Sequence, residues 1–133
     1  MDLAFTAEES AFRDEVRAFL GERLPRRLSD KVRSGKRLQR ADMLEWHAIL
    51  NERGWLASHW PREHGGPGWD AVQKFIFENE CALAGAPRVV AFGVSMLGPV
   101  LIRYGSDEQK RYWLPRILDG SDWWCQGLSL IHI

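Results

Sequence analysis

Three helix-start signals recur along this sequence, and they constrain its fold more than any other feature. Thr6, Asp70 and Ser106 each stand three positions before a Glu or a Gln. In this arrangement, the capping box, the two side chains satisfy N–H groups of the first helical turn. Each cap stabilises its helix by about 1 kcal/mol. The sequence therefore predicts helices that begin at or just after these three residues.

The spacing of the apolar residues predicts an all-α domain of about five helices. We expect them at residues 7–24, 41–53, 71–84, 88–104 and from 106 to just before Gly120. The fourth is apolar nearly all round, so we expect it to be buried. Pro115 removes a backbone donor from the fifth, so we expect a kink there.

Residues 55–69 differ in kind, because they hold two prolines, three glycines and three tryptophans. Such a segment suits neither a helix interior nor a central strand. Large aromatic side chains favour burial, so we expect an ordered loop. His59 and His64 flank Glu63 in this loop, which leaves a metal site open as one interpretation. No further ligand motif accompanies them, so we favour hydrogen bonding within the loop.

A basic run occupies residues 23–40, where eight basic residues accompany one acid, Asp30. We interpret this run as a solvated linker between two helices. The alternative is a landing site for an anionic partner or for a cofactor phosphate. No aromatic residue is interleaved in the run, so stacking on nucleic-acid bases is not expected.

The composition excludes several other classes of protein. The chain has 18 basic and 18 acidic residues, so its charge gives no indication of nucleic-acid binding. Its longest uncharged stretch, residues 89–102, is shorter than the ~20 residues that a membrane-spanning helix needs. Cys81 and Cys125 form no Cys-x-x-Cys motif, and the acidic N-terminus does not resemble a signal peptide. We therefore expect a cytoplasmic protein.

Three motifs stand in a fixed order along the chain. Residues 60–68 read WPREHGGPG, residues 104–120 contain YGSDEQK followed by WLPRILDG, and residues 124–127 read WCQG. In this order and spacing they resemble the N-terminal domain of the acyl-CoA dehydrogenase family and the first strand of its middle domain. The sequences of these motifs are most similar to those of family branches that act on bulky or dicarboxylic acyl-CoAs, such as the large subunit of pimeloyl-CoA dehydrogenase.

The resemblance implies domain boundaries. Residues 1–121 correspond to the helical N-terminal domain, and residues 122–127 correspond to the first strand of the β domain. The family continues this strand with Ser-Glu-Pro-Gly, whereas residues 128–133 read LSLIHI. That tail resembles the translated end of a transposase sequencing adapter, so we interpret it as non-native. The resemblance thus implies a truncated dehydrogenase.

The resemblance also implies a reaction. In this family a glutamate base removes the α-proton of an acyl-CoA thioester, while a hydride leaves the β-carbon for FAD. That base lies in the C-terminal helical domain, so we expect no catalytic residue in this chain and no activity from it alone. Electron-transfer flavoprotein or a similar acceptor, and a homo- or hetero-oligomeric assembly, are expected for the full-length protein.

The same resemblance assigns candidate site residues. The fourth helix would line the acyl pocket, and the strand would reach the edge of the flavin. The acyl-facing candidates are Phe92, Val94, Ser95, Leu97 and Gly98, and the flavin-edge candidates are Gln126 and Gly127. Glycine allows a ligand or a helix to approach the backbone closely. Ordinary helix packing and an ordinary strand are the respective alternatives.

A second class of function stays open from the sequence alone. The chain could be a stand-alone helical binding module that uses its fourth helix and loop tryptophans as a contact surface. An orphaned half-domain should expose apolar surface and aggregate. A monodisperse, cooperatively folding monomer would favour the module.

Overall fold

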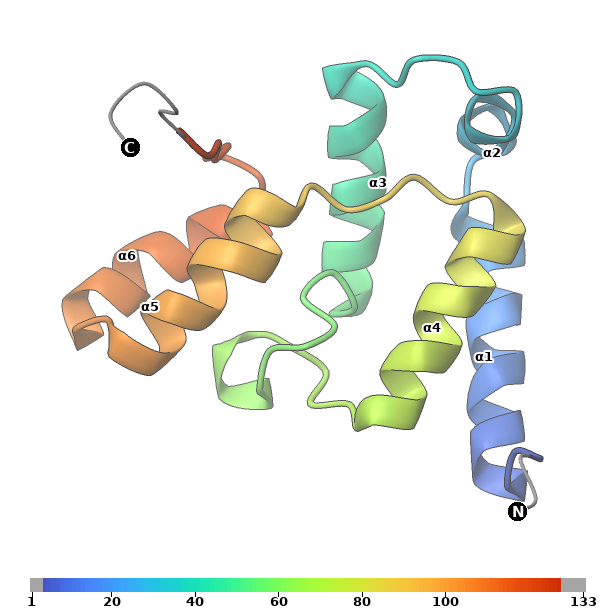
Figure 1. Ribbon diagram of the computed structural model, residues 1–133, viewed down its shortest axis with the longest axis horizontal. Coiled ribbons are helices and arrows are strands. Elements are labelled where there is room, and N and C mark those ends of the chain that lie inside the picture. Colours follow the sequence, from blue (N-terminus) through green and yellow to red (C-terminus); the bar gives the residue numbers. More distant parts are fainter. Residues whose placement is uncertain (1–3, 128–133) are drawn as a thin grey trace, which may run out of the picture.

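The computed structural model describes residues 4–127, which are helical and contain no strand (Figure 1). The α-helices are α1 (Ala7–Arg23), α2 (Arg26–Arg33), α3 (Arg40–Arg53), α4 (Ala71–Ala84), α5 (Gly98–Tyr104) and α6 (Asp107–Leu118). A short 3-10 helix, η1 (Arg62–His64), lies in the loop before α4, and a π-helix, η2 (Phe92–Leu97), runs directly into α5. The predicted all-α class is confirmed.

The helices form two pairs with α3 between them (Figure 1). α1 and α4 pack against each other, and α6 packs against both η2 and α5. An extended segment, residues 85–90, carries the chain from the first pair to the second. Across residues 4–127, every helix is too short or too polar to span a bilayer.

Trp55 lies at the centre of an aromatic cluster that joins the first pair to the long loop. Its ring centroid is 4.7 Å from that of Phe19, 5.3 Å from Trp69 and 5.8 Å from Phe77. These rings come from α1, the loop and α4, and they meet at tilted or edge-on angles. Such pairs contribute about 0.5–1.5 kcal/mol beyond the burial of their area. The ordered loop predicted over residues 55–69 is therefore confirmed.

The three predicted capping boxes all form. The hydroxyl of Ser106 accepts from the Gln109 N–H at 3.2 Å, and the Gln109 side-chain oxygen accepts from the Ser106 N–H at 2.9 Å. The same reciprocal bonds form at the other two caps, Thr6–Glu9 and Asp70–Gln73. Local hydrogen bonding thus fixes where α1, α4 and α6 begin.

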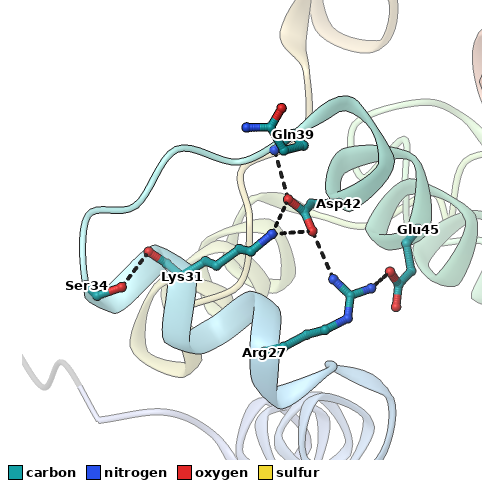
Figure 2. A network of polar contacts seen from close by, with 6 residues as sticks. All are labelled: Arg27, Lys31, Ser34, Gln39, Asp42 and Glu45. Carbon is teal, nitrogen blue, oxygen red and sulfur yellow. Dashed lines mark hydrogen bonds and ion pairs between the residues drawn. The ribbon is translucent and has the colours of Figure 1, made fainter.

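The interpretation of the basic run as a solvated linker is wrong, because α2 forms there. Leu28 of α2 is fully buried. The basic side chains meet a buried carboxylate on α3 (Figure 2): Lys31 Nζ lies 2.7 Å from Oδ2 of Asp42, and Arg27 donates to Oδ1 at 2.9 Å. These charges are therefore partly neutralised within the domain.

The helix predicted over residues 88–104 differs from the structure in two ways. It begins only at residue 91, and it starts with π-helical turns. It is also not buried all round, since Met96 is 48% exposed, Val100 53% and Tyr104 79%. Within the described chain, no other element covers this side.

The strand expected at the end of the chain is not formed. Residues 123–127 are irregular in the structure. A strand needs a neighbouring strand to receive its backbone hydrogen bonds, and residues 4–127 contain none.

The last helix, α6, is not ended by its proline, since it continues through Pro115 to Leu118. The proposed boundaries at residues 121 and 127 stay predictions, and the tail at 128–133 lies outside the described residues.

Candidate functional site

η2 is a π-helix, a rare form in which a backbone hydrogen bond spans five residues instead of four. The Gly98 N–H accordingly donates to the carbonyl of Gly93, five positions earlier. Short π-helical segments occur often at functional sites. η2 coincides with the segment that carries the predicted acyl-facing residues.

Those five residues divide between two sides of the helix. Phe92 is 36% exposed, Ser95 is exposed and Leu97 is half-buried. Val94 is only 2% exposed and Gly98 is buried, so both face the interior. The structure therefore brings Phe92 and Ser95 to an open side and places Val94 and Gly98 behind it.

Further side chains extend the open side along α5. Met96, Val100 and Tyr104 follow Phe92 at intervals of four residues, and all are exposed. Residues four apart lie on one side of a helix. We call this surface the open face (Phe92, Ser95, Met96, Val100 and Tyr104). Sequence reasoning missed Met96, although its spacing from Phe92 is a usable signal.

The inward side of η2 rests on the tryptophan of the glycine-rich loop. Trp60 is 1% exposed, and its indole Nε1 donates to the Val94 carbonyl at 2.8 Å. The structure gives His59, a metal-ligand candidate, the same partner, with Nε2 3.2 Å from the Val94 oxygen. A Cβ at Gly98 would lie 2.0 Å from Cζ2 of Trp60. Glycine at this position therefore lets the indole ring pack directly on the helix backbone.

α6 supports the start of η2 and is held by α3. A Cβ at Gly93 would lie 3.2 Å from Ile117 of α6 and 3.0 Å from Trp124. His47 of α3 contacts the end of α6, with Nε2 3.1 Å from the carbonyl oxygens of both Ile117 and Leu118. Burial lowers the pKa of His47, because it disfavours the charged ring. His47 therefore acts as a neutral donor that satisfies backbone carbonyls at a helix end.

The predicted flavin-edge residues follow directly after this contact. Trp124 packs edge-on against Trp113, with ring centroids 5.2 Å apart, and its buried indole N–H has no partner within the described residues. Gln126 and Gly127 are exposed, and no atom of the described residues 4–127 lies within 4 Å of a Cβ built at Gly127. These two residues are accessible to another group, but they form an edge and not an enclosed site.

A groove elsewhere on the domain competes with the open face, which is an exposed surface, as a candidate site. This groove of about 550 Å³ lies between α1, α2 and α4. In it Glu80, which is 6% exposed, accepts hydrogen bonds from Arg17 at 2.9 and 3.0 Å. None of the three sequence motifs lies on this groove, whereas the loop motif and the α6 motif both support η2. The open face is therefore the stronger candidate.

Comparison with known proteins shows the family to which the chain belongs. The family model described as "Acyl-CoA dehydrogenase, N-terminal domain" matches residues 6–121. The chain belongs to the acyl-CoA dehydrogenase family. It is 38% identical over 127 residues to acyl-CoA dehydrogenase IpdE1 of Mycolicibacterium smegmatis, and 34% identical over 122 residues to acyl-CoA dehydrogenase FadE26 of Mycobacterium tuberculosis. The matches cover 92% and 90% of this chain but only 32% and 30% of those dehydrogenases.

Solved structures share the fold of this chain. The ChsE4-ChsE5 complex from Mycobacterium tuberculosis matches with a TM-score of 0.72 and 33% identity, over 90% of this chain and 30% of that chain. The Tcur3481-Tcur3483 steroid ACAD matches with a TM-score of 0.71 and 35% identity, over 90% and 31%. The chain thus spans about a third of the length of the dehydrogenases that it matches.

Proposed function

We propose that this domain serves a flavin-dependent dehydrogenase that introduces an α,β double bond into an acyl-CoA thioester. The observation that carries the proposal is the family match over residues 6–121, which contains the loop motif and the α6 motif. Because the matched part is about a third of each relative, we place the glutamate base and most of the flavin site in polypeptide outside residues 1–127.

The domain's own contribution would be a wall of the acyl pocket. Phe92 and Met96 on the open face offer apolar surface, whose burial contributes about 25 cal/mol per Å². Ser95 lies between them as a polar group, and Leu97 is half-buried beside them. Val94 and Gly98, also predicted to face the acyl chain, would support this wall from behind by packing on the loop.

FAD is the cofactor that the proposal requires, and it would accept the hydride that leaves the substrate. Gln126 and Gly127 fit the edge of a flavin site, since both are exposed and uncrowded. Residues 4–127 form no cradle around these two positions, so the flavin would be held mainly by other polypeptide. The role of Gln126 and Gly127 would be to approach the ring from one side.

We propose a bulky, steroid-like acyl group as the substrate. A solved relative is described as a steroid ACAD, and the sequence motifs are most similar to branches that act on bulky acyl-CoAs. The open face extends over thirteen residues from Phe92 to Tyr104, which is roughly 15–18 Å along a helix axis. Such a length suits a ring system that lies along the helix.

We further propose that the full-length protein is a cytoplasmic hetero-oligomer that passes its electrons to electron-transfer flavoprotein or a similar acceptor. The support for a hetero-oligomer is that the ChsE4-ChsE5 structure is a complex of two differently named proteins. The exposed apolar side chains of α4, Phe75 and Leu83, are consistent with a protein contact in such an assembly.

A domain graft tests the proposal. Residues 1–127 of this chain replace the matched N-terminal part of IpdE1 from Mycolicibacterium smegmatis, together with any partner subunit that the parent enzyme needs. We expect the graft to retain flavin and to lose its flavin absorbance when a steroid-ring acyl-CoA is added without oxygen. Octanoyl-CoA should act more slowly, because it contacts less of the open face.

The unaltered parent enzyme is the control for the graft. The proposal would be contradicted by a graft that folds and carries flavin, but whose flavin is not reduced by any of the acyl-CoAs that reduce the parent enzyme. No observation on the described residues favours the stand-alone helical module. A monodisperse 133-residue monomer with cooperative unfolding, combined with an inert graft, would make the module the better account.

A further inference from the structure

The carbonyl of Val94 cannot find a donor in the usual positions of its own helix. In an α-helix its donor would be the N–H of residue 98, and in a π-helix the N–H of residue 99. Gly98 gives its N–H to Gly93 instead, and residue 99 is proline, which has no N–H. Leaving a buried acceptor unpaired costs about 1–3 kcal/mol. The sequence therefore requires a donor from outside η2.

Trp60 supplies that donor from the glycine-rich loop. Its indole N–H reaches the Val94 oxygen at 2.8 Å, and His59 reaches the same oxygen at 3.2 Å. Both donors are 34 or 35 positions away from Val94 in sequence. This pair of contacts connects the loop motif to the helix that carries the open face.

The glycine-rich loop fixes Trp60 in place. The Trp60 N–H donates to the Ala57 carbonyl at 2.9 Å, and the Trp60 carbonyl accepts from the Gly68 N–H at 3.3 Å. A Cβ at Gly66 would lie 2.1 Å from the Trp60 carbonyl oxygen, so only glycine fits there without backbone movement. Gly66 and Gly68 thus contact the tryptophan backbone, and the indole projects onto η2.

We infer that Trp60, assisted by His59, is a positioning residue that keeps η2 in its π register and so turns Phe92, Ser95 and Met96 outward. Loss of the π turn would shift the register by one residue, which is about 100° around the helix. A different set of side chains would then form the open face. The acyl-binding part of this inference rests on the proposed function, whereas the register itself does not.

The register is tested on the full 133-residue chain. Trp60→Phe keeps a ring but removes the donor, and we expect amide hydrogen exchange at residues 95–98 to become about tenfold faster. Adding Pro99→Ala restores an N–H that can reach Val94 in the same register that Gly98 uses for Gly93. The double variant should therefore recover most of the lost protection.

Trp46→Phe is the matched control, because Trp46 is equally buried at 1% exposure but lies on α3. It should leave exchange at residues 95–98 unchanged. The inference is overturned when Trp60→Phe leaves this exchange unchanged, when Trp46→Phe accelerates it equally, or when Pro99→Ala gives no recovery. If Trp60→Phe fails to fold, the hydrogen bond from Trp60 is tested on the unaltered chain instead. The Trp60 indole N–H should then exchange far more slowly than the indole N–H of exposed Trp123, and equal rates would overturn the inference.

The functional part is tested in the IpdE1 graft. Trp60→Phe should change the ratio of KM values for steroid-ring acyl-CoA and octanoyl-CoA by about fivefold, with flavin content unchanged, and Pro99→Ala should reverse the change. An unchanged ratio alongside faster exchange would overturn the link to acyl binding. A graft that reduces flavin with no acyl-CoA would instead refute the proposed function, while the exchange data still decide the register.

Discussion

Oδ2 of Asp42 lies 2.7 Å from Nζ of Lys31, and this contact joins α3 to α2 (Figure 2). Asp42 is only 4% exposed. It also accepts from Arg27 at 2.9 Å and from the Gln39 N–H at 2.8 Å, the latter at the start of α3. One carboxylate therefore both docks a helix and satisfies the first turn of another.

We predict that Asp42→Asn destabilises the domain, because a neutral amide leaves Lys31 without its counter-charge and leaves Arg27 with Glu45 alone. The measurement is the urea concentration at the midpoint of unfolding, with circular dichroism as the signal. Asp30→Asn is the matched control, since Asp30 is exposed and its substitution should change stability by no more than about 0.5 kcal/mol. Equal effects of the two substitutions would refute the role given to Asp42.

Acid should weaken the same contact. Hydrogen bonding from Lys31 and then from the Gln39 backbone lowers the pKa of Asp42 below its ordinary 3.8. Its contribution to stability is therefore present above pH 3.8 and is lost as the pH falls through the lower, folded-state pKa. The unfolding midpoint of the natural chain should fall more steeply below pH 4 than that of Asp42→Asn. Parallel curves would contradict this prediction.

His47 predicts a separate loss of stability at mildly acidic pH. Burial lowers its pKa below 6.5, so the unfolded chain binds the proton more readily than the folded one. Stability should be level above about pH 7 and should fall below pH 6.5, by at most about 1.4 kcal/mol per pH unit. His47→Gln keeps a donor for the α6 carbonyls but cannot titrate, so its stability should stay flat between pH 5 and 7. A slope equal to that of the natural chain would exclude His47 as the source.

Two glycine substitutions should act in opposite directions. Gly98→Ala places a Cβ 2.0 Å from the Trp60 ring, and we expect a loss of about 1–3 kcal/mol. Gly21→Ala in α1 meets nothing within 4 Å, and we expect a gain of about 0.5–1 kcal/mol from helix propensity. Urea unfolding of both variants measures the difference. A stabilising Gly98→Ala would show that the indole does not pack on that backbone.

Local patterns predicted the parts of the fold that depend on local contacts. The capping boxes act within four residues, so the starts of α1, α4 and α6 could be predicted from the sequence. α2 could not, because its charges are satisfied by Asp42, 11 positions from Lys31 and 15 from Arg27. A basic run in isolation looks like a solvated linker.

The sequence predicted which segment carries the candidate site, but it did not predict which side chains of that segment face outward. The resemblance directed attention to residues 92–98, yet it did not separate Phe92 and Ser95 from the inward Val94 and Gly98. That division follows from the π register, which depends on a donor 34 positions away in Trp60. Pro99 was the one local sign, since its missing N–H leaves Val94 without a helical partner.

The most direct test of the account is photolabelling of the IpdE1 graft with a diazirine-bearing acyl-CoA, followed by mass spectrometry of the labelled peptides. We predict labels on the open face, at Phe92, Ser95 or Met96, and protection of these residues by excess unlabelled acyl-CoA. Labels confined to the groove between α1, α2 and α4 would contradict the placement of the acyl pocket. So would labels that appear in this domain only at residues that excess acyl-CoA fails to protect.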